Sequence, residues 1–169
     1  VFGVGVGMAG VIDRNRAVVR HATYSGWRDL PFGALLEKRL GLPVVVDNDV
    51  NALTAAEQWF GAGRSAANFI VISLGRGIGM GMVMDGRLYR GAGGGAGEFG
   101  HVTVVPDGLL CACGKRGCLE TLVSEPAMVE QIRAALQAPI SIQEAIAGAQ
   151  AGNPDLHAIF ANAGRVLGM

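Results

Sequence analysis

The sequence predicts an α/β fold that ends in a helical tail, and three observations carry this prediction. Short apolar, β-branched stretches alternate with helical patterns through the first half of the chain. Glycine is abundant, at 27 of 169 residues, and it gathers at 3–10, 75–81 and 91–100, which indicates special backbone rather than a flexible linker. Beyond Cys118 the pattern is helical.

The expected elements follow in order along the chain. We expect strands at 1–7, 17–20 and 43–47, the last one apolar as in the interior of a parallel sheet. A helix with Pro31 near its first turn should run to about residue 40, and Asn48 or Asp49 should cap a second helix through residue 59. Strands at 68–74 and 78–84 surround a glycine turn, and Asp85-Gly86 closes a hairpin to 87–90. The last expected elements are a strand at 101–105 and helices at 126–136, 141–151 and 154–166.

Composition and charge narrow the functional classes. Half of the residues are hydrophobic, which is enough to bury a core and excludes a disordered chain. Lys+Arg and Asp+Glu both number 14, so the chain by itself is a poor nucleic-acid binder, because duplex affinity rests on basic side chains. No stretch is long and apolar enough to span a membrane, and no secretory signal is evident. We therefore expect a cytoplasmic bacterial protein with reduced cysteines.

The two ends of the sequence indicate a piece of a longer protein. Val1 begins a strand pattern without a lead-in, and the last residues follow a helical pattern that does not end. A fragment is expected on these grounds, and a processed or short natural domain is the alternative.

Three cysteines lie close together in the segment Cys111-Ala112-Cys113-Gly114-Lys115-Arg116-Gly117-Cys118. This spacing suits chelation, because several soft ligands must converge on one ion, and Gly114 and Gly117 allow a tight turn. His101 lies upstream and supplies a fourth ligand for a closed, structural Cys3His zinc site. The alternatives are a disulfide plus a free thiol, or three ordinary buried cysteines.

Polar side chains surround this loop and follow the strand at 43–47. Asn48 and Asp49 would face the crevice where α/β folds bind ligands, although either one could simply cap the helix. Glu98 and Glu120 flank the expected metal loop, and each taken alone is typical of a solvated surface acid. With His101, the set is rich in acceptors and poor in cations. It suits a neutral polyol such as a sugar rather than a phosphorylated or acidic ligand.

A glycine-rich turn spans residues 74–81. Gly75, Gly77 and Gly79 are candidates for a phosphate loop, because glycines let backbone N–H groups approach phosphate oxygens. The turn joins two strands rather than a strand and a helix, so a dinucleotide-binding interpretation is weak, and no Walker sequence occurs. A tight hairpin without a ligand is the alternative.

Three motifs together resemble the ROK family, which includes sugar-responsive repressors and sugar kinases of the actin-like ATPase (ribonuclease H-like) fold. They are the runs VDNDVN at 46–51, GEFGH at 97–101 and the cysteine loop through Glu120. The resemblance covers about residues 4–167. It implies a structural zinc on His101, Cys111, Cys113 and Cys118. It also implies sugar contacts from Asn48, Asp49, Glu98, His101 and Glu120. In the kinases, the residue that matches Asp49 is the general base, which acts with ATP and Mg²⁺.

The chain departs from the kinase pattern at several points. Arg76 stands where kinases usually carry Thr, so a hydroxyl for the ATP phosphate is missing, and the run LGRGIG is similar to the repressor branch. Asp47, where kinases commonly have Glu, favours the same branch. The family's first phosphate-binding segment and its late Gly-Gly segment lie outside these residues. We therefore expect residues 1–169 to be a partial sugar-binding domain without a complete ATP site.

Three functional hypotheses follow, in order of preference. The first is the effector domain of a sugar-responsive transcriptional regulator, in which sugar alters DNA affinity through a helix-turn-helix domain outside this chain. The second is an ATP-dependent, glucokinase-like sugar kinase with Asp49 as base. The third is a structural domain whose sugar residues are relics. The resemblance also implies a homodimer or a larger assembly.

Overall fold

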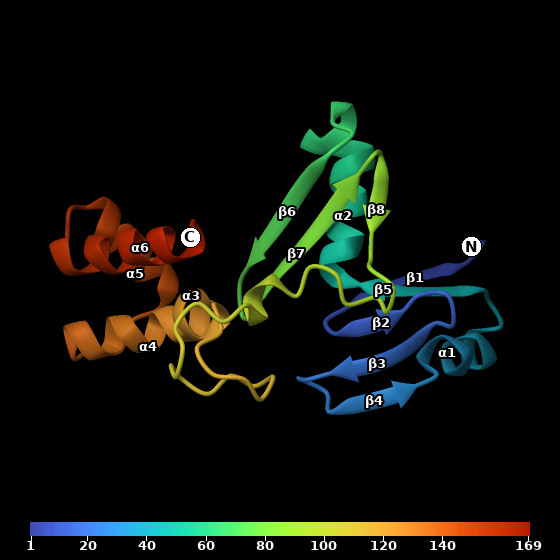
Figure 1. Cartoon of the computed structure of the whole chain (residues 1–169), viewed down its shortest axis with the longest axis horizontal. Coiled ribbons are helices and arrows are strands. Elements are labelled where there is room, and N and C mark those ends of the chain that lie inside the picture. Colours follow the sequence, from blue (N-terminus) through green and yellow to red (C-terminus); the bar gives the residue numbers. More distant parts are fainter. The chain divides into compact units, whose positions relative to one another are not determined.

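The computed structural model describes all residues from Val1 to Met169 and divides into two compact units. Unit 1 comprises residues 1–73 and 79–98, and unit 2 comprises residues 74–78 and 99–169. Figure 1 labels the helices and strands along the chain. None of the helices has both the length and the apolar character needed to cross a membrane.

The strands are short and lie in three small sheets. Their bounds are β1 (Val4–Met8), β2 (Val11–Asp13), β3 (Val18–Ala22), β4 (Trp27–Leu30), β5 (Val44–Asn48), β6 (Phe69–Leu74), β7 (Ile78–Met84) and β8 (Arg87–Tyr89). The helices of unit 1 are α1 (Phe32–Leu40), α2 (Asp49–Phe60) and the 3-10 helix η1 (Ala62–Ser65). Those of unit 2 are the 3-10 helix η2 (Phe99–His101), α3 (Glu120–Val123), α4 (Glu125–Leu136), α5 (Ile142–Gln150) and α6 (Pro154–Leu167).

Two of the sheets share one apolar core in unit 1. β1 pairs in parallel with β5, so that Met8 lies opposite Asn48, and β2, β3 and β4 form an antiparallel sheet. The buried members of the core are Ile12, Val19, Ala22, Val44 and Val46. The strands expected at 1–7, 17–20 and 43–47 are confirmed with shifted ends. The sequence patterns do not predict β2 or β4.

The third sheet has the order β6-β7-β8 and confirms the expected hairpins. Asp85 and Gly86 both have positive φ, +49° and +72°, which matches the tight turn that this dipeptide favours. β7 packs closely on α2, because a Cβ on Gly81 would overlap the side chain of Thr54. Glycine at this position therefore brings the strand against the helix.

The helices begin and end close to the predicted residues. α1 follows Pro31 and ends at Gly41, whose φ of +66° is a left-handed conformation that suits glycine. In unit 2, α5 begins with a capping box in which Ser141 and Glu144 bond reciprocally. Figure 1 shows α4, α5 and α6 in the orange and red part of the chain, and they bury Ile132, Ala145 and Leu156. The predicted helical tail is confirmed.

The prediction of a strand at 101–105 is wrong. η2 ends at His101, and the following residues make only isolated bridges, such as the one between Thr103 and Cys118. The N–H groups of Val104 and Val105 both donate to the Gly117 carbonyl, at 2.9 and 3.2 Å. This segment therefore pairs irregularly with the end of the cysteine loop, and a regular ladder does not form.

Candidate functional site

Four side chains of unit 2 with metal-binding donors converge on one point. They are His101, Cys111, Cys113 and Cys118, and their donor atoms all lie within 4.8 Å of one another. The Sγ atoms of Cys113 and Cys118 are 3.7 Å apart, and Sγ of Cys111 lies 3.5 Å from Nδ1 of His101. All three cysteines are free thiols rather than members of a disulfide.

Two of the separations between these donor atoms fit a tetrahedral ion. Metal–sulfur and metal–nitrogen distances of about 2.3 and 2.0 Å place two sulfurs about 3.8 Å apart, and a sulfur and a nitrogen about 3.5 Å apart. The separations of 3.7 and 3.5 Å match both values. Three soft sulfurs and an imidazole suit a transition metal or zinc, whereas calcium and magnesium prefer oxygen ligands. The cluster could therefore hold one metal ion with four protein ligands.

Backbone hydrogen bonds and glycines shape the loop that carries the cysteines. The Cys111 N–H donates to the Lys115 carbonyl at 2.8 Å, and the Gly114 N–H donates to the Cys111 carbonyl at 2.9 Å. Gly114 and Gly117 have φ of +90° and +67°. A Cβ on Gly117 would also overlap the Val105 carbonyl oxygen, so no other residue fits there without movement of the backbone.

Burial and hydrogen bonds set the ionisation of the three thiols. Burial, reinforced by the neighbouring thiols, raises the pKa of Cys118 to about 12. Burial also raises the pKa of Cys111. It opposes ionisation of Cys113 as well, but the Lys115 N–H and the other two thiols outweigh it and lower the pKa of Cys113. Cys111 and Cys118 are therefore neutral at pH 7 until a cation stabilises their thiolates.

Glu120 opens α3 directly after the cysteine loop and is bonded to the glycine turn. Its Oε2 accepts a hydrogen bond from the Ile78 N–H at 2.9 Å. Close by in sequence, the Glu125 N–H donates to the Gly75 carbonyl at 2.8 Å. The start of α3 and the start of α4 therefore hold the two ends of the glycine turn. The interpretation of Glu120 as a merely solvated acid does not describe this bonded carboxylate.

Asn48 and Asp49 lie where β5 ends and α2 begins, as predicted. Asn48 is the cap: its Oδ1 accepts from the N–H groups of Val50 and Asn51 at 2.9 and 3.1 Å, and its Nδ2 donates to the Gly10 carbonyl at 3.1 Å. Asp49 is exposed, and its Oδ1 accepts from the Val50 N–H at 3.0 Å. The capping role therefore belongs to Asn48, and the carboxylate of Asp49 faces solvent.

A buried carboxylate with two arginine partners precedes these residues, and the sequence patterns do not predict the pairing. Oδ2 of Asp47 accepts hydrogen bonds from Nε and Nη2 of Arg90, at 3.0 and 2.7 Å, and Nε of Arg14 lies 3.5 Å away. The signal that points to it is an Asp at the end of an apolar strand, because a buried carboxylate needs a cation. The sequence does not say which arginine supplies it.

The five predicted sugar contacts belong to two units. Asn48, Asp49 and Glu98 are in unit 1, and His101 and Glu120 are in unit 2. Glu98 is exposed and follows Gly97, whose φ is +87° and whose carbonyl accepts the Met80 N–H at 3.0 Å. A shared sugar site of all five residues stays a prediction.

The glycine turn joins β6 to β7, as predicted, and its glycines differ in their surroundings. A Cβ on Gly79 would approach Cγ2 of Val50 to 2.7 Å, so close packing on α2 accounts for glycine there. The Cβ position of Gly75 is open. A phosphate-loop role for Gly75, Gly77 and Gly79 stays a prediction.

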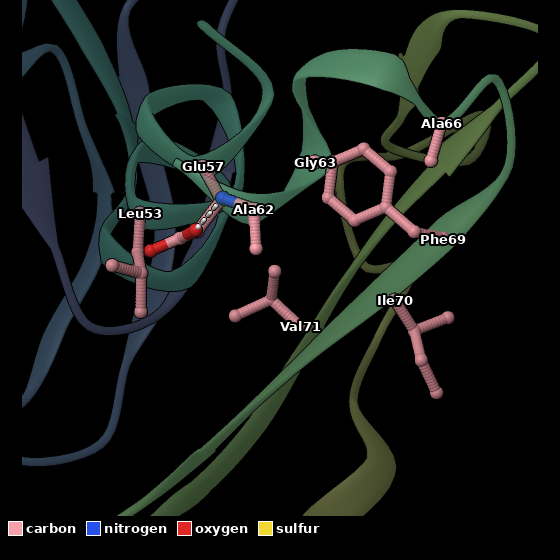
Figure 2. Close-up of a pocket in the computed structure, with 8 residues that line it drawn as sticks. All are labelled: Leu53, Glu57, Ala62, Gly63, Ala66, Phe69, Ile70 and Val71. Carbon is pink, nitrogen blue, oxygen red and sulfur yellow. Dashed lines mark hydrogen bonds between the residues drawn. The ribbon is translucent and has the colours of Figure 1, made fainter. Parts of the chain in front are cut away.

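An apolar pocket of about 310 Å³ in unit 1 is separate from the predicted site residues (Figure 2). Its lining residues are Leu53, Glu57, Ala62, Gly63, Ala66, Phe69, Ile70 and Val71. The one charged group, Glu57, is engaged, because its Oε2 accepts the Ala62 N–H at 2.9 Å. A sugar needs several polar partners, so this pocket is not a candidate sugar site.

Comparison with known proteins assigns the family. The model of the ROK family matches residues 1–169. The chain belongs to the ROK family. This ROK chain is 46% identical over 125 residues to the glucokinase of Halalkalibacterium halodurans. The aligned residues cover 73% of this chain and 38% of that protein. Over 155 residues it is 42% identical to the glucokinase of Streptomyces coelicolor, with 92% and 49% covered. Over 133 residues it is 37% identical to the xylose repressor of Caldicellulosiruptor bescii, with 79% and 33% covered.

Solved structures confirm the predicted actin-like fold. A ROK family glucokinase from Streptomyces griseus, in complex with glucose and AMPPNP, superposes with a TM-score of 0.90 at 38% identity, covering 98% of this chain and 59% of that one. A ROK family transcriptional regulator, a homolog of the E. coli MLC protein, also gives 0.90 at 34% identity, covering 98% and 44%. The chain spans less than half of the three curated relatives named above. Kinases and regulators share this scaffold, so the scaffold alone does not select between them.

Metal uptake should release protons from the thiols. Because the pKa values of Cys111 and Cys118 are raised, Zn²⁺ binding at pH 7 should release at least about two protons per ion. Calorimetry of the metal-free protein in buffers of different ionisation enthalpy measures this number. The affinity should weaken as the pH falls, since protons compete for the sulfurs. Uptake without proton release would contradict thiolate ligation.

Proposed function

We propose that residues 1–169 form the sugar-sensing effector domain of a ROK-family transcriptional regulator, which binds a hexose or a related sugar beside a structural zinc ion. The observation that carries this proposal is the convergence of the four donor atoms within 4.8 Å of one another, on a loop that leads directly into Glu120. A fixed loop holds its own flanking residues, and in this chain those include His101 and Glu120, two of the five predicted sugar contacts.

Zinc would be held by Nδ1 of His101 and the sulfurs of Cys111, Cys113 and Cys118. With four protein ligands the ion supplies structure rather than a reactive water. His101 would then present Nε2–H as a hydrogen-bond donor to a sugar hydroxyl. Glu120, which already accepts the Ile78 N–H through Oε2, would accept from another hydroxyl.

Sugar binding is supported by the polar end of β5 and by the relatives. Asn48 uses its Oδ1 to cap α2 and one N–H of Nδ2 to bond Gly10, which leaves a second N–H for a ligand. Asp49 offers an exposed carboxylate beside it. Relatives of this chain are named glucokinases and xylose repressors, and the S. griseus glucokinase holds glucose.

Arg76 favours the regulator. It occupies the glycine turn, at the position where the kinases of the family usually carry Thr, and its side chain is exposed. A bulky cation in place of that hydroxyl disfavours the approach of an ATP phosphate in the kinase geometry. DNA would be bound by a helix-turn-helix domain that is not part of residues 1–169, and the assembly would be a homodimer or larger.

A sugar kinase is the second candidate, and the 46% identity to a glucokinase favours it. Asp49 would then be the general base: its carboxylate would take the proton of the attacking sugar hydroxyl while the sugar oxygen bonds to the γ-phosphorus of Mg²⁺-ATP and ADP leaves. The exposure of Asp49 at the N-terminus of α2 is compatible with this role.

Asp49→Asn in the whole protein separates the two candidates. We expect the variant to bind D-glucose or D-xylose about tenfold or more weakly by calorimetry, because hydrogen bonds to a charged group contribute about 1.5–3 kcal/mol. Asp85→Asn, in the exposed hairpin turn, makes the same charge change and should leave the affinity unaltered. A coupled assay of the parent protein with ATP and a panel of hexoses should show no sugar-dependent ADP formation. Robust turnover that Asp49→Asn abolishes would establish the kinase instead.

Cys113→Ser tests the zinc. The parent should contain about one zinc per chain. The variant should bind less metal, melt at a lower temperature and bind sugar more weakly, because metal binding energy is folding energy. Ala112→Ser introduces the same hydroxyl at an exposed neighbouring position and should change none of the three. The zinc proposal fails if elemental analysis of the parent finds well under one metal per chain while all three thiols titrate freely.

A further inference from the structure

Among the acidic side chains that form ion pairs in unit 1, that of Asp47 is the least exposed. Its side chain is 12% exposed and that of Arg90 is 28% exposed, whereas the pairs of Arg20 with Asp13 and Asp29 lie nearer the surface. Both Nε and Nη2 of Arg90 donate to the same oxygen, Oδ2. A partly buried charge pair is screened less by salt than an exposed one, and charge-assisted hydrogen bonds of this kind are short and geometrically specific.

The other oxygen of Asp47 reaches the residues that carry the predicted sugar contacts. Oδ1 accepts the Asn48 N–H at 2.9 Å, which fixes the last peptide of β5. Asn48 in turn caps α2 and bonds the Gly10 carbonyl. The orientation of Asn48, and of Asp49 after it, therefore depends on the plane of the Asp47 carboxylate.

Arg90 also stands at the start of the loop that ends at Glu98. Its carbonyl accepts the Ala96 N–H at 3.1 Å, which closes the loop at its base, and the next residue, Gly97, accepts the Met80 N–H. No Cβ fits on Gly97, because it would overlap the Met80 carbonyl oxygen. The backbone of Arg90 thus anchors the segment that carries Glu98, while its side chain anchors Asp47.

We propose that Arg90 is a positioning residue. Through Asp47 it holds two segments that carry predicted sugar contacts, residues 47–51 and residues 91–98, in a fixed arrangement. The proposal rests on the proposed sugar site, because Asn48, Asp49 and Glu98 are its predicted contacts in unit 1. Arg90 itself touches no ligand in this account. Arg14, with Nε 3.5 Å from Oδ2, is the weaker second partner and cannot replace two short hydrogen bonds.

The test uses the whole protein with its metal bound, and D-glucose and D-xylose as probes. The variants are Arg90→Ala, Arg90→Lys, Asp47→Asn and the double variant Arg90→Ala/Asp47→Asn. Arg20→Ala is the matched control, since Arg20 also forms ion pairs, with Asp13 and Asp29, but in a part of unit 1 without predicted contacts. The readouts are the sugar dissociation constant by calorimetry and amide hydrogen exchange of the ligand-free protein.

We expect Arg90→Ala to weaken sugar binding by about tenfold or more, since small misplacements of binding groups have effects of this size or larger. Exchange should rise in both segments, 47–51 and 91–98, and not in β2, β3 and β4. Arg90→Lys should restore part of the affinity, because lysine keeps the charge but not the paired donors. In the Asp47→Asn background, Arg90→Ala should have little further effect, because Arg90 acts through Asp47.

Three results would overturn the proposal. The first is a sugar affinity of Arg90→Ala within about twofold of the parent, and the second is that Arg90→Ala weakens sugar binding as much in the Asp47→Asn background as in the parent. The third is faster amide exchange in only one of the two segments. If Arg90→Ala does not fold, Arg90→Lys and Asp47→Asn provide the same comparison. If the parent binds neither sugar, the proposed function fails. The exchange data then decide alone whether Arg90 joins the two segments.

Discussion

Three sulfurs and one imidazole nitrogen converge within 4.8 Å of one another, and the cysteine loop of unit 2 is folded around that convergence. The cysteine loop can close only with Gly117 in a left-handed conformation against the Val105 carbonyl. The segment after His101 forms no regular strand pairing, and its backbone N–H groups bond to the end of the cysteine loop instead. Burial raises the pKa of Cys111 and Cys118, so a divalent cation would have to displace protons from these two thiols.

A second constraint acts in unit 1, where a carboxylate is buried at the end of an apolar strand. Asp47 satisfies one oxygen with Arg90 and the other with the backbone of Asn48. Arg90 therefore links the start of the loop to Glu98 with the Asp47 side chain, and the neighbouring Asn48 side chain caps α2 and bonds the Gly10 carbonyl. The same fold serves glucokinases and transcriptional regulators among the relatives, so the scaffold alone does not determine the function.

The sequence predicts the local features well, for physical reasons that can be named. The cysteine cluster is confined to one short segment, so its convergence needs no knowledge of distant contacts. The cap at Asn48 and the end of α1 at Gly41 follow from backbone chemistry of single residues. The strand predicted at 101–105 fails because β-branched residues signal extended backbone but not a pairing partner. The partnership of Asp47 with Arg90 spans 43 positions and is decided by tertiary packing, which no local pattern encodes.

X-ray absorption at the zinc edge of the purified protein would show directly whether the cysteine cluster holds the ion. We expect one zinc per chain with three sulfur neighbours at about 2.3 Å and one nitrogen neighbour at about 2.0 Å, and no oxygen bound to the metal. A first shell of oxygen and nitrogen atoms without sulfur, or no zinc at all, would contradict it.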